Sequence, residues 1–282
     1  MSSFWSWKLI RAGAFRLDGG GLFGLVPKAL WSKMMEPDEK NRIDLQSNCL
    51  LLERDGVKVL VESGLGDKWN EKQRLIYHME PRTILDGLRE VGCDPEEVDH
   101  IILTHLHLDH AAGLTRFNQN GEAVSNFPNA KIHLQRIEWE DAQAGKTTMK
   151  GNYLPTHLEP IAAQVRLLDG EAQILPGLEV WPMVGHTWGQ QAVRLDDGSG
   201  IVAFCGDVMP TVHHLPLSYN MAYDMLPYSN MLSKKRLLET AAAKRWRLVL
   251  AHEPGDPVVE VVVEPGHADG FRLLCPSTKD NP

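Results

Sequence analysis

Short runs of hydrophobic residues alternate with amphipathic segments along most of the chain, a pattern typical of an α/β protein whose strands are mostly buried. Several of these runs are rich in Val, Ile and Leu, which favour strands. A helix is expected over Pro81–Val91, ending at Gly92, and another over Ser233–Trp246, with Ser233 as its N-cap. The expected strands cover residues 49–53, 57–61, 100–104, 131–134, 178–183, 201–205 and 248–251.

Two segments show neither the strand pattern nor the helix pattern and are predicted to be long loops. Residues 18–47 contain three consecutive glycines, and residues 209–231 are crowded with Pro, Tyr, Met and His. Long loops in compact domains often carry function. The length of 282 residues allows one large α/β domain or two small ones. The polar, Pro-containing residues at about 265–282 are expected to form a C-terminal tail.

Composition narrows the classes of partner. The 29 Lys and Arg residues against 37 Asp and Glu residues give a net charge of −8, which disfavours binding to a phosphate backbone. No stretch approaches the ~18 apolar residues of a membrane span, and the N-terminus lacks a signal-peptide pattern. The four cysteines form no CxxC pair. We expect a cytoplasmic protein, with neither nucleic acid nor a membrane as partner.

The most informative segment is 105–110, which reads His-Leu-His-Leu-Asp-His. Imidazole and carboxylate groups are the ligands expected for Zn²⁺ or a related first-row metal. If the chain leaves the preceding strand still extended, His105, His107 and Asp109 project to one side, Leu106 and Leu108 face the core, and the next turn begins after Asp109. Burying so many polar groups without a metal would cost several kcal/mol. The segment therefore predicts a metal site.

Three later residues are positioned to complete the site, because each follows a hydrophobic run: His186, Asp207 and His252. In layered α/β folds such residues collect at one edge of the sheets. Taken alone, Asp207 could be a turn residue and His252 a capping residue. Together with the 105–110 segment they supply five His and two Asp, enough for two divalent cations, with zinc as the first choice. The other histidines lack this context, although His213 and His214 lie just beyond Asp207 and are the nearest alternatives.

At this point the sequence resembles the metallo-β-lactamase-fold hydrolase superfamily, through segment 105–110 followed by Gly-His-Thr at 185–187, Gly-Asp at 206–207 and Ala-His at 251–252. The resemblance implies a single domain over 1–282, an αββα sandwich of four layers with the metals at one edge of the two sheets. Its core would cover about 45–255, with substrate-side loops at about 18–47 and 209–231 and the C-terminal tail at about 265–282. It also implies that Asp207 bridges the metals. The other ligands implied are His105, His107 and His186 for one metal, and Asp109, His110 and His252 for the other. Many members have Asp where this chain has Glu62, which puts one contact behind the ligands in doubt.

Within the superfamily, segments 206–211, 221–224 and 20–28 are similar to quorum-quenching N-acyl homoserine lactone lactonases and to methyl-parathion-hydrolase-like enzymes. This implies an enzyme in which a hydroxide bridging two metals opens a lactone or cleaves an ester, an N-acyl homoserine lactone in the first place. A phosphotriesterase, another ester or thioester hydrolase, and a non-catalytic metal-binding module remain as alternatives. A redox di-iron enzyme is disfavoured, because such members resemble HxExDH and this chain has His107 at the Glu position.

Residues outside the ligand set are expected to handle the substrate. Asp109 is the candidate proton shuttle, and Tyr223 the candidate to hold the carbonyl oxygen, with Tyr219 and Tyr228 as alternatives. The apolar residues of the two long loops suit an acyl chain or an aromatic leaving group, and we expect Phe23, Met221 and Tyr223 to contact substrate. The alternative is that these residues pack on one another or across the interface of a homodimer.

Overall fold

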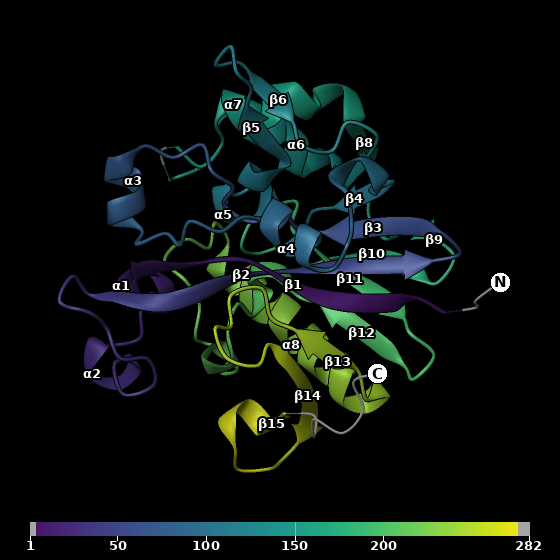
Figure 1. The fold of residues 1–282 in the computed structure, drawn as a ribbon. Coiled ribbons are helices and arrows are strands. Elements are labelled where there is room, and N and C mark those ends of the chain that lie inside the picture. Colours follow the sequence, from purple (N-terminus) through teal and green to yellow (C-terminus); the bar gives the residue numbers. More distant parts are fainter. Residues whose placement is uncertain (1–3, 150, 276–282) are drawn as a thin grey trace.

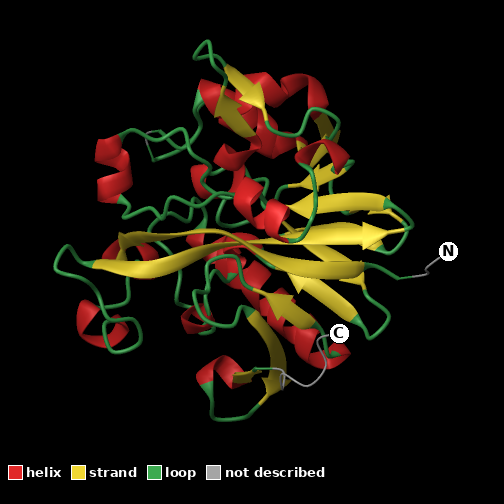
Figure 2. Ribbon diagram, in the orientation of Figure 1, coloured by secondary structure: helices red, strands yellow, loops and turns green. Residues whose placement is uncertain are grey.

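The fold is built from two β-sheets packed against each other, with helices on the outer side of each (Figures 1 and 2). The computed structural model describes residues 4–149 and 151–275. Within these residues the first sheet has six strands, in the order β1-β2-β3-β4-β7-β8. Its strands are β1 (Ser6–Asp18), β2 (Arg42–Arg54), β3 (Val57–Val61), β4 (His100–Ile102), β7 (Lys131–Gln135) and β8 (Val165–Leu168). The first three pair antiparallel, and β3, β4, β7 and β8 run parallel.

The second sheet has seven strands within the described residues, in the order β15-β14-β13-β12-β11-β10-β9. All neighbours pair antiparallel except β12 and β13, which are parallel. Its strands are β9 (Ala172–Leu175), β10 (Leu178–Pro182), β11 (Gln191–Asp196), β12 (Ile201–Phe204), β13 (Arg247–Val249), β14 (Val258–Val263) and β15 (Phe271–Leu274). A separate hairpin joins β5 (Thr115–Phe117) to β6 (Ala123–Ser125).

Successive side chains of the central strands point to opposite faces of the sheet, and this produces the layers of the fold. In β2, Leu50 and Leu52 point into the core between the sheets, whereas Cys49 and Leu51 pack toward the helices over the first sheet. Because successive strand residues face opposite sides, a run that is hydrophobic throughout is buried on both faces. A further core lies between the second sheet and α8. The expected four-layer αββα sandwich in a single domain is therefore confirmed.

The helices are short apart from α8. They are α1 (Gly19–Phe23), α2 (Lys28–Trp31), α3 (Glu71–Ile76), α4 (Ile84–Glu90), α5 (Leu108–Ala111), α6 (Arg136–Gln143), α7 (Pro155–Leu158) and α8 (Pro227–Lys244). The 3₁₀ turns are η1 (Pro95–Glu97), η2 (Ala112–Leu114), η3 (Glu159–Gln164), η4 (Gly206–Val208), η5 (Val212–His214) and η6 (Ala268–Gly270). No helix in the ranges 4–149 and 151–275 is long and apolar enough to span a bilayer.

Each strand expected from the hydrophobic runs overlaps a strand of the structure, but several elements differ from expectation. Helix α8 begins at Pro227, so Ser233 is not its N-cap, and its Oγ instead donates to the carbonyl of Val184 at 2.7 Å. The expected helix over Pro81–Val91 is shorter and begins after Thr83, whose backbone and hydroxyl are both bonded by Asp86.

The predicted loop at 18–47 is also only partly a loop. It contains α1 and α2, and β2 already begins at Arg42. The predicted loop at 209–231 ends where α8 begins, at Pro227. In the predicted tail, β15 pairs with β14, and residues 276–282 lie outside the described residues. The hydrophobic runs did not predict β1, β5, β6, β8, β9, β11, β14 or β15. In β1 polar and charged residues interrupt the apolar ones, and β5, β6, β8, β9 and β15 are only three or four residues long.

Candidate metal centre

The proposed ligands all follow strands, at one edge of the two sheets. His105 and His107 lie in the loop after β4, and His186 lies in the turn after β10. Asp207 is in η4, directly after β12, and His252 follows β13. Because the strand ends meet at this edge, residues far apart in the sequence come together. His105 and His252, for example, are separated by 147 positions (252 − 105).

The local conformation of segment 105–110 differs from the extended one predicted. The chain turns into α5 at Leu108, so Asp109 lies on the first turn of a helix rather than on the same extended face as His105 and His107. Leu106 is buried as expected. The helix turn directs Asp109 and His110 toward His252, with Asp109 Oδ2 3.5 Å and His110 Nε2 3.1 Å from His252 Nε2.

Two buried carboxylates hold the backbone of this loop. Glu62 accepts a hydrogen bond from the amide of Thr104 at 2.7 Å, and Glu138 accepts one from the amide of Leu106 at 2.9 Å. Glu138 also accepts from the hydroxyl of Thr187 at 2.6 Å, which ties this loop to the turn that carries His186. Amides that would be unsatisfied in a buried loop are thereby paired, and the loop is fixed on both sides.

The donor atoms form two groups. In the first, His105, His107 and His186 each offer a nitrogen, with all three nitrogens within 4.8 Å of one another. In the second, an oxygen of Asp109 and one nitrogen each of His110 and His252 lie within the same distance of one another. Asp207 lies between the groups: its Oδ1 is 3.1 Å from Nε2 of His252, and its Oδ2 is 3.4 Å from Nε2 of His186. One carboxylate thus faces both groups.

This donor set fits divalent metal ions. Nitrogen and oxygen ligands about 2.0–2.1 Å from a tetrahedral zinc stand about 3.3 Å apart. Nε2 of His186 lies 2.8 Å from Nδ1 of His107, and Nε2 of His110 lies 3.3 Å from Oδ1 of Asp207. Moreover, Nε2 of His105 and Oδ1 of Asp207 are buried without a hydrogen-bond partner among the described residues. Buried polar atoms left unpaired are costly, and cations bound at the two donor groups would satisfy both atoms.

The second ring nitrogen of three histidines is held by a neighbour. Nδ1 of His186 donates to Asp224 at 2.8 Å, and Nδ1 of His252 donates to the carbonyl of Gln46 at 3.1 Å. Nδ1 of His105 lies 3.0 Å from the hydroxyl of Thr104. Such contacts fix the orientation of ligating imidazoles. Sequence reasoning missed these partners, although Asp224 ends one of the segments that resemble lactonases.

Glu62 contacts the candidate ligand His110, although many family members have Asp at this position. Its Oε2 lies 3.2 Å from Nδ1 of His110, and its other oxygen holds the Thr104 amide. The residue adopts a φ of 68°, in the left-handed region that side chains rarely occupy. Such strain persists where surrounding contacts fix the conformation, and it is frequent at functional sites.

Electrostatics favour the ligating forms of the two loop histidines and of the central carboxylate. Burial, together with the neighbouring imidazoles, lowers the pKa of His105 and His107 well below the ordinary value, which keeps both rings neutral. Burial alone would raise the pKa of Asp207, but the charges of His252, His110 and His186 hold it well below its ordinary value. Asp207 is therefore a carboxylate.

A cavity of about 210 Å³ opens onto these groups. The donor residues at its wall are His107, Asp109, His186, Asp207 and His252. The remaining lining is largely apolar and includes Phe15, Leu17, Leu22, Leu65, Leu108 and Met221. Tyr77 and Tyr223 also line the cavity. Of the residues expected to contact substrate, Met221 and Tyr223 thus face the cavity that contains the candidate ligands.

Phe23 lies elsewhere. Its side chain is fully buried, stacked between Trp31 at 5.6 Å and His214 at 4.9 Å between ring centroids, and it is not among the residues that line the cavity. His214 is likewise a core residue, with Nε2 3.0 Å from the carbonyl of Leu22. Tyr219 packs edge-on against Phe23, and Tyr228 is 70% exposed, so neither Tyr lines the cavity.

The run of three glycines makes room for two aromatic side chains. A Cβ at Gly21 would lie 2.1 Å from the hydroxyl oxygen of Tyr223, and one at Gly19 would lie 2.4 Å from the Trp31 ring. Neither contact could be relieved without moving a large ring. Glycine at position 21 therefore allows Tyr223 to approach α1 and to take its place at the cavity wall.

Comparison with known proteins agrees with this architecture. The family model described as the Metallo-beta-lactamase superfamily matches residues 42–252. The chain belongs to the metallo-β-lactamase superfamily. It is 28% identical over 225 residues to an N-acyl homoserine lactonase of Bacillus cereus, a match covering 76% of this chain and 80% of that protein. It is also 30% identical to an N-acyl homoserine lactonase of a Bacillus species over 165 residues, which span 60% of that relative.

Two solved structures of the same fold align over almost the whole chain. The structure of a probable metal-dependent hydrolase from Staphylococcus aureus superposes with a TM-score of 0.86 at 25% identity, covering 97% of this chain and 98% of that one. The dizinc quorum-quenching lactonase AidC superposes with a TM-score of 0.77 at 18% identity, covering 97% of this chain and 95% of that one. This metallo-β-lactamase superfamily member is a metal-dependent hydrolase.

Proposed function

We propose that this hydrolase opens lactone rings, N-acyl homoserine lactones in the first place, at a centre of two divalent cations, with zinc as the first choice. The observation that carries the proposal is the position of Asp207 between two complete groups of donors. Further support comes from the Bacillus relatives, which are N-acyl homoserine lactonases, and from AidC, which is a dizinc lactonase of the same fold.

The proposed ligands fall into two groups, one for each cation. One cation would be held by His105, His107 and His186, and the other by Asp109, His110 and His252, with Asp207 available to both. When bound, such a pair of cations supplies a water acidic enough to act as the nucleophile at neutral pH and a Lewis acid for a carbonyl oxygen. The chain needs no serine or cysteine nucleophile for this reaction.

Asp109 is suited to handle the proton of the leaving group. It lines the cavity, and its side chain retains 14% exposure. Opening a lactone releases an alkoxide, which must be protonated before the product leaves. A carboxylate at the cavity wall can accept a proton from the attacking water and deliver it to that oxygen. This assigns Asp109 a catalytic role besides its role as a ligand.

Tyr223 is suited to hold the carbonyl oxygen of the substrate. Burial, with smaller contributions from nearby carboxylates, raises the pKa of Tyr223 to about 12, so its hydroxyl stays protonated at neutral pH. A protonated phenol can donate a hydrogen bond to an oxygen on which negative charge develops. The apolar lining formed by Leu22, Leu65 and Met221 limits the access of water to the same place.

The proposal is tested with a panel of N-acyl homoserine lactones, carboxyl esters and phosphotriesters, monitored by proton release, with the metal content measured on the same sample. We expect lactone opening that depends on about two bound cations per chain. Phosphotriester hydrolysis without lactone opening would assign the site to the alternative substrate class. Full lactone opening by protein shown to be free of metal would refute the metal centre itself.

The cellular location and the binding partners are also part of the proposal. All four cysteines are free, three of them buried, which is compatible with a reducing cytoplasm. A small lactone or ester is the proposed partner. The homodimer and the absence of nucleic-acid or membrane binding stay predictions from the sequence.

A further inference from the structure

Glu138 is a buried carboxylate whose hydrogen-bond partners are all uncharged. It lies on the first turn of α6 and is 1% exposed. Its oxygens accept from the amide of Leu106 at 2.9 Å, the hydroxyl of Thr187 at 2.6 Å and the hydroxyl of Tyr153 at 3.4 Å. No basic side chain of the described residues forms an ion pair with Glu138. A buried negative charge without an opposite charge nearby is costly, so this carboxylate favours a cation in its surroundings.

Each of the three donors adjoins a member of one group of candidate ligands. This group, here called the three-histidine group, consists of His105, His107 and His186. Leu106 lies between the first two histidines in the sequence, and Thr187 directly follows the third. The ring of Tyr153 lies 5.7 Å from the ring of His107, measured between centroids. One side chain, that of Glu138, therefore joins the two chain segments that supply this group.

The turn that carries His186 packs directly against the backbone of α6. A Cβ at Gly189 would lie 2.5 Å from the amide nitrogen of Glu138 and 2.7 Å from its Cα. These are backbone atoms, which cannot move aside as the end of a flexible side chain can. Glycine at position 189 therefore lets the turn approach α6 closely enough for the hydroxyl of Thr187 to reach the carboxylate.

The second group of candidate ligands is supported by a different carboxylate. This group, here called the Asp109 group, consists of Asp109, His110 and His252. Glu62 lies 3.2 Å from Nδ1 of His110 and also accepts from the amide of Thr104, so it contacts the loop on the side of both groups. Within the described part of the chain, Glu138 forms no hydrogen bond with the Asp109 group. The support given by Glu138 is therefore confined to the three-histidine group.

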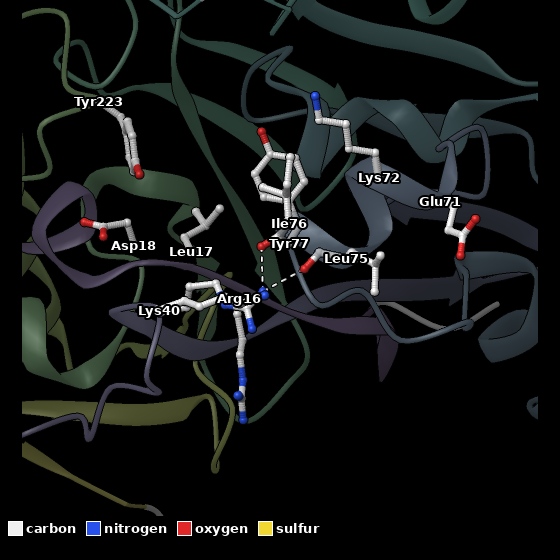
Figure 3. Close-up of a pocket in the computed structure, with 11 residues that line it drawn as sticks. Arg16, Leu17, Asp18, Lys40, Glu71, Lys72, Leu75, Ile76, Tyr77 and Tyr223 are labelled. Carbon is white, nitrogen blue, oxygen red and sulfur yellow. Dashed lines mark hydrogen bonds between the residues drawn. The ribbon is translucent and has the colours of Figure 1, made fainter.

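Glu138 does not line the cavity at the candidate ligands. It is absent from the wall of that cavity, which has a volume of about 210 Å³, and from the wall of a larger cavity of about 650 Å³ beside it (Figure 3). The two cavities share Leu17, Tyr77 and Tyr223. Because Glu138 lines neither cavity, its effect on a reaction there must act through the ligands that it holds. It is a positioning residue and not a catalytic one.

We propose that Glu138 positions the three-histidine group and, through its negative charge, favours the cation bound there, while the Asp109 group holds its own cation without it. A change at Glu138 should therefore empty one group and leave the other occupied. This inference rests on the proposed function, because it concerns one half of the same metal centre.

The test removes zinc from the zinc-loaded protein by titration with a chelating dye, while the ring ¹⁵N signals of the histidines report which group each ion leaves. Glu138→Gln keeps the size of the side chain, and its amide can still accept from Leu106 and donate to Thr187, so that mainly the charge is lost. We expect zinc affinity at the three-histidine group to fall about 10–100-fold, and affinity at the Asp109 group to stay unchanged.

Two further variants make the result specific. Thr187→Val removes one hydrogen bond to Glu138 without changing the charge, and it should weaken the same group by a smaller factor. This variant also supplies the test if Glu138→Gln does not fold. Glu140→Gln, the same change at an exposed position of the same helix, should leave the zinc affinity of both groups at the wild-type value.

The selectivity between the two groups decides the outcome. Loss of zinc from the three-histidine group alone supports the positioning role, even if the enzyme opens no lactone and the proposed substrate class fails. Equal loss of zinc from both groups, or wild-type affinity at both groups, overturns the role of Glu138 even if lactone opening is efficient.

Discussion

Asp224 joins a proposed metal ligand to the loop that lines the active-site cavity. Its Oδ1 lies 2.8 Å from Nδ1 of His186, and its Oδ2 accepts hydrogen bonds from the amide of Met221 and the side chain of Asn230, both at 3.1 Å. Met221 faces the cavity, and Asn230 belongs to the first turns of α8. One buried carboxylate therefore orients an imidazole and fixes the adjacent loop.

Replacing Asp224 with Ala should weaken metal binding by about 10–100-fold, because an imidazole without its partner loses both orientation and basicity. The measurement is a competition titration of zinc against a chelating dye. Asp44→Ala is the control, since Asp44 has a side chain 65% exposed and forms only a surface ion pair. Unchanged zinc affinity in Asp224→Ala would show that His186 is oriented by other contacts.

Asp207→Asn should remove metal ions from the centre, because an amide offers one neutral oxygen where the carboxylate offers two charged ones to the two donor groups. We expect elemental analysis to give fewer than about two ions per chain, together with a large loss of activity. Cys205→Ser is the control: the thiol is buried beside the carbonyl of Ala203 at 3.6 Å and should leave the metal content intact. Full occupancy and turnover in Asp207→Asn would contradict the bridging role.

Phe23→Ala should lower the free energy of unfolding by about 3–5 kcal/mol, because it empties a site stacked between Trp31 and His214. Urea denaturation measures this loss. Since Phe23 does not line the cavity, the properly folded fraction should keep its preference among acyl chain lengths. Leu25→Ala, at a position 99% exposed, should change the unfolding free energy by less than about 0.5 kcal/mol. A reordered substrate preference in Phe23→Ala would instead support the substrate contact expected from the sequence.

Lys234 should make stability depend on pH. Its ammonium is buried in α8 and donates to the carbonyls of Pro216 and Tyr219, and burial lowers its pKa to about 7 from the ordinary 10.5. Between these values the unfolded chain holds a proton that the folded chain has released, so the unfolding free energy contributed by this residue rises with pH from about 7 to about 10.

Urea denaturation across that pH range should therefore show a rise in the wild type that Lys234→Met lacks. Lys33→Met, at an exposed lysine, should retain the rise. An identical pH dependence in the wild type and Lys234→Met would mean that the buried amine keeps its proton in the folded protein.

The candidate ligands could be found from the sequence because their signal is local. Each follows a hydrophobic run, and the run itself predicts a buried strand whose end lies at the edge of the sheet. The spacing within 105–110 adds residue types that favour a metal. These features need no knowledge of what the segments contact. The pattern by itself indicated an α/β protein, and the four-layer architecture was implied by the family resemblance.

The path of the backbone through the site was less predictable. Asp109 lies on α5 and not on an extended segment, because the chain turns at Leu108 where the amides of the preceding loop are held by Glu62 and Glu138. Those carboxylates lie 42 and 32 residues from the amides that they bind. A pattern read within a short window carries no information about contacts at that separation.

Only the tertiary structure decided which side chains support the site and which fill the core. Phe23 and Met221 are equally apolar in the sequence, yet one is stacked in the interior and the other faces the cavity. Asp224 meets His186 across 38 residues, and Gln46 meets His252 across 206. The sequence by itself determined the ligand types and the buried strands, since residue chemistry and hydrophobic periodicity are properties of the local chain. The packing partners depend on how distant segments are brought together. The physical reason is that burial of an apolar side chain is favourable beside any apolar neighbour, so it does not specify which neighbour that is.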